Sequence, residues 1–165
     1  MKIRLNKINI IRIIKDHYAT LENANTGKSE ADDWLAFWVL PIILGIGVTT
    51  LQPKISDNNI NLIITSLSIF VGLLINVVVL IFSLGQKGVS EATLKNTVLK
   101  QTISNICYTI LISIINIVIA FLISVMKNEI MVILFSAIIY IVTLHFFVTL
   151  LMIVKRMYLL FMNEL

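Results

Sequence analysis

The sequence predicts an all-α polytopic membrane protein, in which four transmembrane helices form an antiparallel bundle with both termini in the cytoplasm. Apolar residues make up 58% of the 165 residues and charged residues only 13%, whereas soluble domains contain roughly 25% charged residues. The charges are also segregated, and they leave four uncharged windows of 20, 29, 26 and 25 residues. About 20 apolar residues cross a hydrocarbon core. The windows are continuously apolar and must satisfy their own backbone hydrogen bonds, so we expect helices and not a β-barrel.

The predicted spans cover residues 34–51, 62–84, 103–126 and 130–154. They leave a segment 1–33, a loop 85–102 and a tail 155–165 on one side of the membrane. These three regions hold eleven Lys and Arg residues, whereas the other side holds only Lys54 and Lys127. By the positive-inside rule, the first side is the cytoplasm and the protein belongs to the cytoplasmic membrane. Anionic lipid accounts for the net charge of +4, so no nucleic-acid partner is needed.

The N-terminal segment 1–33 predicts an interfacial helix followed by a linker. Its isoleucines alternate with Lys and Arg, and one helical face collects Ile3, Ile10, Ile11, Ile14 and Tyr18. Such a helix lies along the membrane surface. The polar stretch 20–33 is typical of a linker, and Trp34 and Trp38 then mark the interface at which the first span begins.

The first span contains Pro41 and the pair Gly45 and Gly47. Proline removes a helical hydrogen bond, so we expect a kink here. Two interpretations stay open, a hinge or gate and simple close packing of helices. In the loop 85–102, Ser90 and Glu91 are suited to a helix start, so the third span should begin near residue 91.

Small and polar residues recur along one face of the second span and one face of the third. The second span carries Thr65, Ser68, Gly72, Asn76 and Ser83, and the third carries Asn105, Thr109, Ser113, Asn116, Ala120 and Ser124. In antiparallel neighbours the two sets are in register, so we expect them to face each other. They form either a helix–helix seam or, in an oligomer, the lining of a water-filled path.

His145 is the one charge-capable side chain deep in a predicted span, which makes it a candidate gate or protonation site. The alternative is a neutral packing histidine, hydrogen-bonded within the bundle. Counted from the outer ends, Asn76 lies at similar depth and is its expected neighbour.

No catalytic, cofactor-binding or metal-binding residues are predicted. His17 and His145 are too few for a metal cluster, and no nucleophile stands with a base, so we expect no enzyme activity and no cofactor. The single cysteine, Cys107, is interpreted as a packing residue.

Several short blocks of sequence carry a resemblance: 26–28, followed by the run Asp33-Trp34-Leu35-Ala36-Phe37 and by Leu40-Pro41; 67–76; and 150–158. They resemble small uncharacterised four-span bacterial membrane proteins, some associated with phage-defence gene neighbourhoods. The resemblance implies a bacterial inner membrane and an antiviral context, and it carries over no site residue.

We therefore expect a homo-oligomer in the lipid bilayer, acting as a pore-forming or membrane-perturbing effector controlled from the cytoplasm. The alternative is a non-conducting anchor that binds a cytosolic protein partner through residues 1–33 and 85–102. A proton-coupled transporter is less favoured, because no acidic residue lies inside a predicted span.

Overall fold

The computed structural model describes residues 10–21, 35–87 and 93–162, and within these ranges all regular structure is helical. The elements are α1 (Ile10–Ala19), the π-helix η1 (Leu35–Val39), α3 (Leu40–Leu51), α4 (Asp57–Lys87), α5 (Thr93–Val125) and α6 (Glu129–Met162). The predicted helical fold class is thus confirmed. Ser90 and Glu91 lie outside the described residues, as do Ile3, Trp34 and the predicted linker from residue 22 onward.

Three described helices are long and apolar enough to cross a membrane, over residues 57–83, 97–125 and 129–160. A shorter apolar helix runs from Leu35 to Leu51. Each predicted span overlaps one of these four stretches. The ends agree to within one residue except at residues 62, 103 and 154, where the helical stretches extend five or six residues further. The expected early start of the third span is also confirmed, because α5 is continuous from Thr93.

The long helices exceed the thickness of a bilayer core. With 31, 33 and 34 residues, they measure roughly 46 to 51 Å at about 1.5 Å per residue. A hydrocarbon core is only about 30 Å thick. Each helix therefore has about three to four turns more than a crossing requires.

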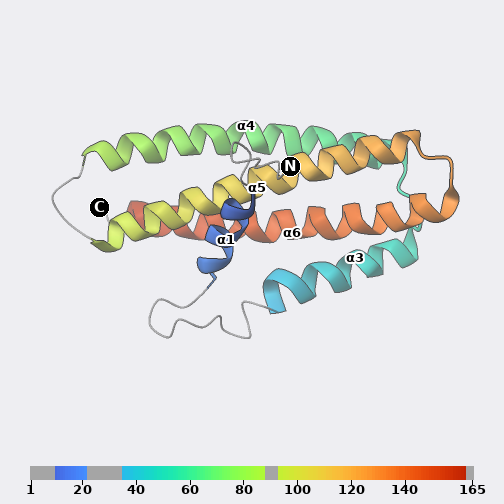
Figure 1. Cartoon of the computed structure of the whole chain (residues 1–165), viewed down its shortest axis with the longest axis horizontal. Coiled ribbons are helices and arrows are strands. Elements are labelled where there is room, and N and C mark those ends of the chain that lie inside the picture. The colour runs from blue at the N-terminus through green and yellow to red at the C-terminus, as the bar shows by residue number, and fades with distance from the viewer. Residues whose placement is uncertain (1–9, 22–34, 88–92, 163–165) are drawn as a thin grey trace, which may run out of the picture.

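The helices pack in the order α4, α5, α6, α3, and close backbone contacts join each helix to the next in this order. Figure 1 shows α4 and α3 on opposite sides of the α5–α6 pair. Among the described residues, each central helix has close backbone contacts with two of these helices, whereas α4 and α3 each have such contacts with one. Side chains of α4 also reach α6, where Phe70 contacts Phe146. Large parts of α3 and α4 therefore remain exposed.

The core consists of three apolar clusters stacked along the bundle. The face that α4 contributes repeats every seven residues and comprises Ile60, Leu67, Leu74 and Ile81, all of them buried. A seven-residue repeat keeps side chains on one side of a helix over several turns. This apolar face is what α4 turns toward its neighbours.

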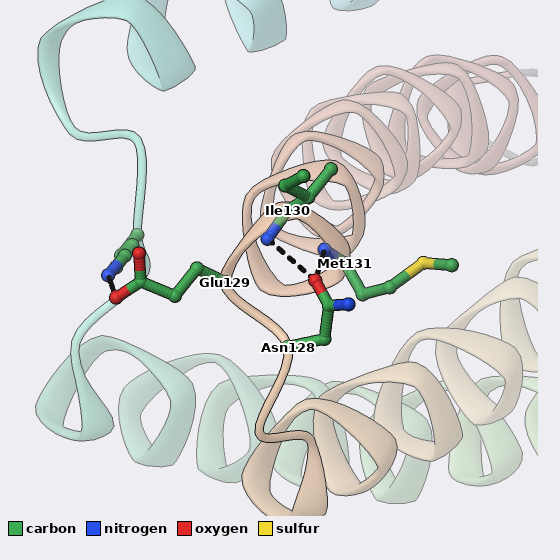
Figure 2. Close-up of polar contacts among 5 residues, drawn as sticks. Asn128, Glu129, Ile130 and Met131 are labelled. Atoms are coloured by element: carbon green, nitrogen blue, oxygen red, sulfur yellow. Dashed lines mark hydrogen bonds and ion pairs between the residues drawn. The ribbon is translucent and has the colours of Figure 1, made fainter.

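The two short connections, 52–56 and 126–128, lie at the same end of the bundle, called here the short-loop end. Asn128 caps α6, since its Oδ1 accepts hydrogen bonds from the N–H groups of Ile130 and Met131 at 3.0 and 3.3 Å (Figure 2). Lys54 Nζ lies 2.7 Å from Glu129 Oε1 and joins the connections. Both side chains are mostly exposed, so this ion pair aligns the ends more than it stabilises them.

The three residues predicted to kink the first span play different parts. Pro41 lies at the start of α3, directly after the π-helical turn of η1. At Gly45 an added Cβ would lie 3.0 Å from the Cα and backbone N of Ile141, so glycine is required for α3 to approach α6. At Gly47 an added Cβ would meet no atom within 4 Å.

Candidate functional site: a docked helix and two polar faces

Helix α1 packs against α5 and buries polar side chains there. His17 is 1% exposed and Thr20 is 8% exposed, while the half-buried Ile13 packs into the central apolar cluster. The predicted apolar face is only partly correct. Ile10 and Ile11 lie on the open side of the helix and are 38% and 66% exposed. Polar residues could take the buried side because partners on α5 satisfy their hydrogen bonds.

His17 is held by a hydrogen bond and by ring stacking. Its Nδ1 lies 2.8 Å from Oδ1 of Asn105, which also lies 2.8 Å from Oγ1 of Thr20. The His17 ring stacks on Tyr108 with centroids 3.7 Å apart and planes 5° from parallel. Burial lowers the pKa of His17 from 6.5 to about 4; the Asn105 bond opposes this, and the neighbouring His145 and Arg156 add to it.

Arg156 of α6 secures the C-terminal end of α1. Its Nη2 donates a hydrogen bond of 2.8 Å to the carbonyl oxygen of Thr20. A cation is favourable at this position, because the last carbonyl groups of a helix lack partners and carry the negative end of its dipole. Together with His17, this contact attaches α1 to both α5 and α6.

Tyr108 connects the two histidines. Besides stacking on His17, it places its hydroxyl oxygen 2.9 Å from Nε2 of His145. His145 Nδ1 lies 2.9 Å from the carbonyl oxygen of Phe37. A carbonyl only accepts, so Nδ1 carries the proton, and in the neutral ring Nε2 accepts the hydroxyl proton of Tyr108.

The contact with Phe37 explains why a histidine stands here. In an α-helix the carbonyl of residue 37 would accept from the N–H of residue 41, but Pro41 has no N–H. His145 supplies a donor from the neighbouring helix. The prediction that His145 and Asn76 are neighbours is wrong. Asn76 is exposed on α4, and His145 is hydrogen-bonded to Tyr108 and to the carbonyl of Phe37.

The polar stripe of α5 points into the bundle. Five of its six members are fully buried at 0% exposure: Asn105, Thr109, Ser113, Asn116 and Ala120. Thr109 and Ser113 bond to backbone carbonyls one turn earlier, and Asn116 Nδ2 donates to Thr143 Oγ1 at 2.8 Å. Ser124, the sixth, is exposed. This stripe therefore faces α1 and α6.

The polar stripe of α4 points outward, and the predicted pairing of the two stripes within one chain is wrong. All five of its residues are exposed: Thr65, Ser68, Gly72, Asn76 and Ser83. At about 100° per residue they lie opposite the buried face that includes Leu67 and Leu74. Ser68 and Ser83 bond to carbonyls of their own helix. Among the described residues, no side chain reaches Asn76.

Sequence reasoning named His145 and the α5 stripe but not the residues that join them. The residues that sequence reasoning missed are Thr20, Tyr108, Thr143 and Arg156. It also missed the hydrogen bond between His17 and Asn105 of α5. A signal was present in α1, where His17 follows Ile13 and Ile14 at helical spacing on a partly apolar face. In the described part of the chain, no group of three or more His, Cys, Asp or Glu could hold a metal ion.

No protein-family model, curated protein or solved structure matches this chain.

Proposed function

We propose that the chain is a four-span protein of a bacterial inner membrane that self-associates through α4 and forms a pore or otherwise perturbs the membrane. Both termini then lie in the cytoplasm, where α1 controls the assembly. The outward polar stripe of α4 is the observation that carries this proposal.

The orientation follows from charge and length. The stretch Leu35–Leu51 counts as the first span, and its 17 residues cover about 25 Å, enough to cross with slight local thinning of the bilayer. The short-loop end, with Lys54 and Lys127 as its only basic residues, faces outward. The spare turns of the three long helices then project into the cytoplasm.

The α4 stripe supports self-association. Lipid tails offer no hydrogen-bond partner, so an amide such as Asn76 on a lipid-facing helix is satisfied best by another protein surface or by water. Gly72 and Ser68 beside it permit close approach of a second helix. A second copy brings the same stripe, and several copies together surround a polar path.

The docking of α1 suits a control element. Its contacts with the bundle are a few polar bonds at His17, Thr20 and Arg156, ring contacts of His17 and Tyr18, and the packing of Ile13 and Ile14. Water can replace each polar bond when the helix leaves, so these bonds add little to the net free energy of docking. A cytoplasmic signal that binds or releases the N-terminal segment can therefore shift the equilibrium.

The alternative is a non-conducting anchor. The length of α4, α5 and α6 beyond a bilayer core favours it, because such projecting helices offer a surface to a cytosolic protein. The phage-defence context implied by the sequence resemblance is compatible with either function. A transporter finds less support, since the uncharged windows leave no acid to couple to a proton.

Leakage measurements separate the two functions. The purified chain in liposomes should release an entrapped dye, and Asn76→Leu should abolish the release. Asn76→Gln should restore it, because the amide is kept. Thr50→Leu is the matched control, since it replaces an exposed polar residue on α3 and should leave leakage intact. If the wild-type chain releases no dye, with or without cell extract, the result would support the non-conducting anchor.

A further inference from the structure

Helices α1 and α5 border an open groove of about 590 Å³. Its polar lining comprises Arg12 and Asp16 of α1 and Lys100, Gln101 and Ser104 of α5. The lining thus contains two cationic side chains, Arg12 and Lys100, and one carboxylate, Asp16. Thr20, the residue through which α1 is attached to Asn105 and Arg156, also lines the groove.

The carboxylate of Asp16 does not neutralise the groove. It lies 3.7 Å from Nε of Arg12, but the side chains are 56% and 81% exposed. An exposed pair of this kind is weak and screened by water. Arg12 and Lys100 therefore remain able to bind an anion.

One polar atom of the groove lining lacks a partner. In the described part of the chain, Oγ of Ser104 is buried without a hydrogen bond and lines the groove. Nδ2 of Asn105 and Nη1 of Arg156 are also buried and unpaired there, but these residues do not line the groove. A buried hydroxyl needs a hydrogen-bond partner and can donate to one. Together with Arg12 and Lys100, this donor suits an acceptor with several oxygens.

The rest of the lining is apolar. Ile13 and Ala19 of α1 and Ile103 and Cys107 of α5 also line the groove. A ligand that contacts the whole lining has an anionic head and a hydrocarbon portion. A soluble anion uses only the basic side chains.

We propose that this groove binds an anionic phospholipid, whose phosphate contacts Arg12, Lys100 and Ser104 and whose acyl chain lies along Ile13, Ile103 and Cys107. The bound lipid bridges α1 and α5 and thereby holds α1 in its docked position. The proposal rests on the orientation proposed above, in which α1 lies at the inner leaflet, where anionic lipid is abundant.

Cys107, the single cysteine, reports on occupancy because it lines the groove. The full chain is placed in vesicles of phosphatidylcholine, with or without phosphatidylglycerol, and its reaction with a maleimide is timed. Phosphatidylglycerol at ten times its Kd should slow labelling about tenfold, in proportion to the unoccupied fraction. Inorganic phosphate added to phosphatidylcholine vesicles should not slow it. Equal protection by phosphate would overturn the lipid assignment.

Matched variants separate a site from general attraction to an anionic surface. Arg12→Gln and Lys100→Gln should each weaken the protection about fivefold, whereas Asp16→Asn should strengthen it by a similar factor, since one charge near the surface has about this effect. Lys15→Gln removes a charge from the same helix outside the groove and should change little. Equal loss with Lys15→Gln would refute a defined site.

Two further measurements keep the outcomes distinct. If Cys107 reacts with maleimide in neither membrane, native mass spectrometry tests the site instead. Phosphatidylglycerol that stays bound to the wild type but not to Arg12→Gln supports the site. A wild-type chain that retains no lipid rejects it. The orientation is tested separately by labelling Lys155→Cys, in a Cys107→Ala chain, from outside intact cells. Labelling there would overturn the proposed topology, whereas a failure of lipid protection alone would leave the leakage proposal standing.

Discussion

Nδ1 of His145 lies 2.9 Å from the carbonyl oxygen of Phe37. Phe37 lies in the π-helical turn η1, and four residues later Pro41 has no N–H with which to form the α-helical bond to this oxygen. The histidine and the proline, which sequence reasoning treats as separate features, thus form one contact between α6 and the beginning of the first apolar helix. In a lipid environment a backbone carbonyl needs such a partner, and neighbouring helices commonly provide it.

A double-mutant cycle tests this relationship. In the wild-type background, His145→Phe should lower the free energy of unfolding by about 1–3 kcal/mol, because it leaves buried acceptor and donor groups unpaired. Pro41→Ala restores an N–H that can bond to the Phe37 carbonyl. In the Pro41→Ala background, His145→Phe should lower the free energy of unfolding by about 1 kcal/mol less than it does in the wild type. Unfolding in mixed detergent and SDS micelles measures the four free energies, and strictly additive values would contradict the contact.

Tyr108 should attach α1 mainly through its ring. Tyr108→Phe keeps the stack on His17 and loses the hydroxyl's interactions with His145 and Tyr18. It should lower the free energy of unfolding by about 1 kcal/mol and leave α1 docked. Tyr108→Leu removes the stack as well and should release α1. The distance between spin labels at the exposed positions Lys15 and Lys155, in a Cys107→Ala chain, distinguishes the outcomes. Identical distance distributions in both variants would show that the ring is dispensable.

Docking of α1 should weaken in acid. Because burial lowers the pKa of His17 from 6.5 to about 4, the docked state binds fewer protons than the released state. Docking is therefore at full strength above pH 6.5 and is lost as the pH falls from 6.5 toward 4. The free energy of docking should change by a total on the order of 3 kcal/mol across this pH range.

The same spin-label pair follows this transition, and His17→Gln is the control. Glutamine can still donate to Asn105 but does not titrate, so its docking should be independent of pH across this window. A transition that persists unchanged in His17→Gln would assign the pH dependence to another group.

The spans were predictable because placing a charge in lipid is costly, so gaps between charges mark the helices before any contact is known. The helical nature of α1 was predictable for a similar reason, from the spacing of its isoleucines. Its docking was not. Burial of His17 depends on Asn105, 88 residues away in sequence, and no local pattern shows that such a partner exists.

The two polar stripes show what periodicity can and cannot predict. It shows correctly that Asn105, Thr109 and Ser113 share one face of α5. It does not show which neighbour that face meets. The central helix α5 has neighbours that cover its stripe, whereas α4 lies at the edge of the described bundle and packs through Leu67 and Leu74 instead. Either face of α4 satisfies a packing rule, so the sequence alone did not decide between them.

Gly72 offers the sharpest test of association through α4. A Cβ at Gly72 would meet no atom within 4 Å in the single chain, and the same is true at Gly47 of α3. Gly72→Ile should therefore leave the monomer folded but prevent close approach of a second α4, and weaken self-association at least about tenfold, or about 1.4 kcal/mol. Gly47→Ile introduces the same side chain on an exposed face of another helix and should associate like the wild type. Energy transfer between labelled copies in phosphatidylcholine vesicles, titrated against the protein-to-lipid ratio, gives both affinities. If the two glycine variants associate equally well, α4 is not the interface and the outward Asn76 needs another explanation.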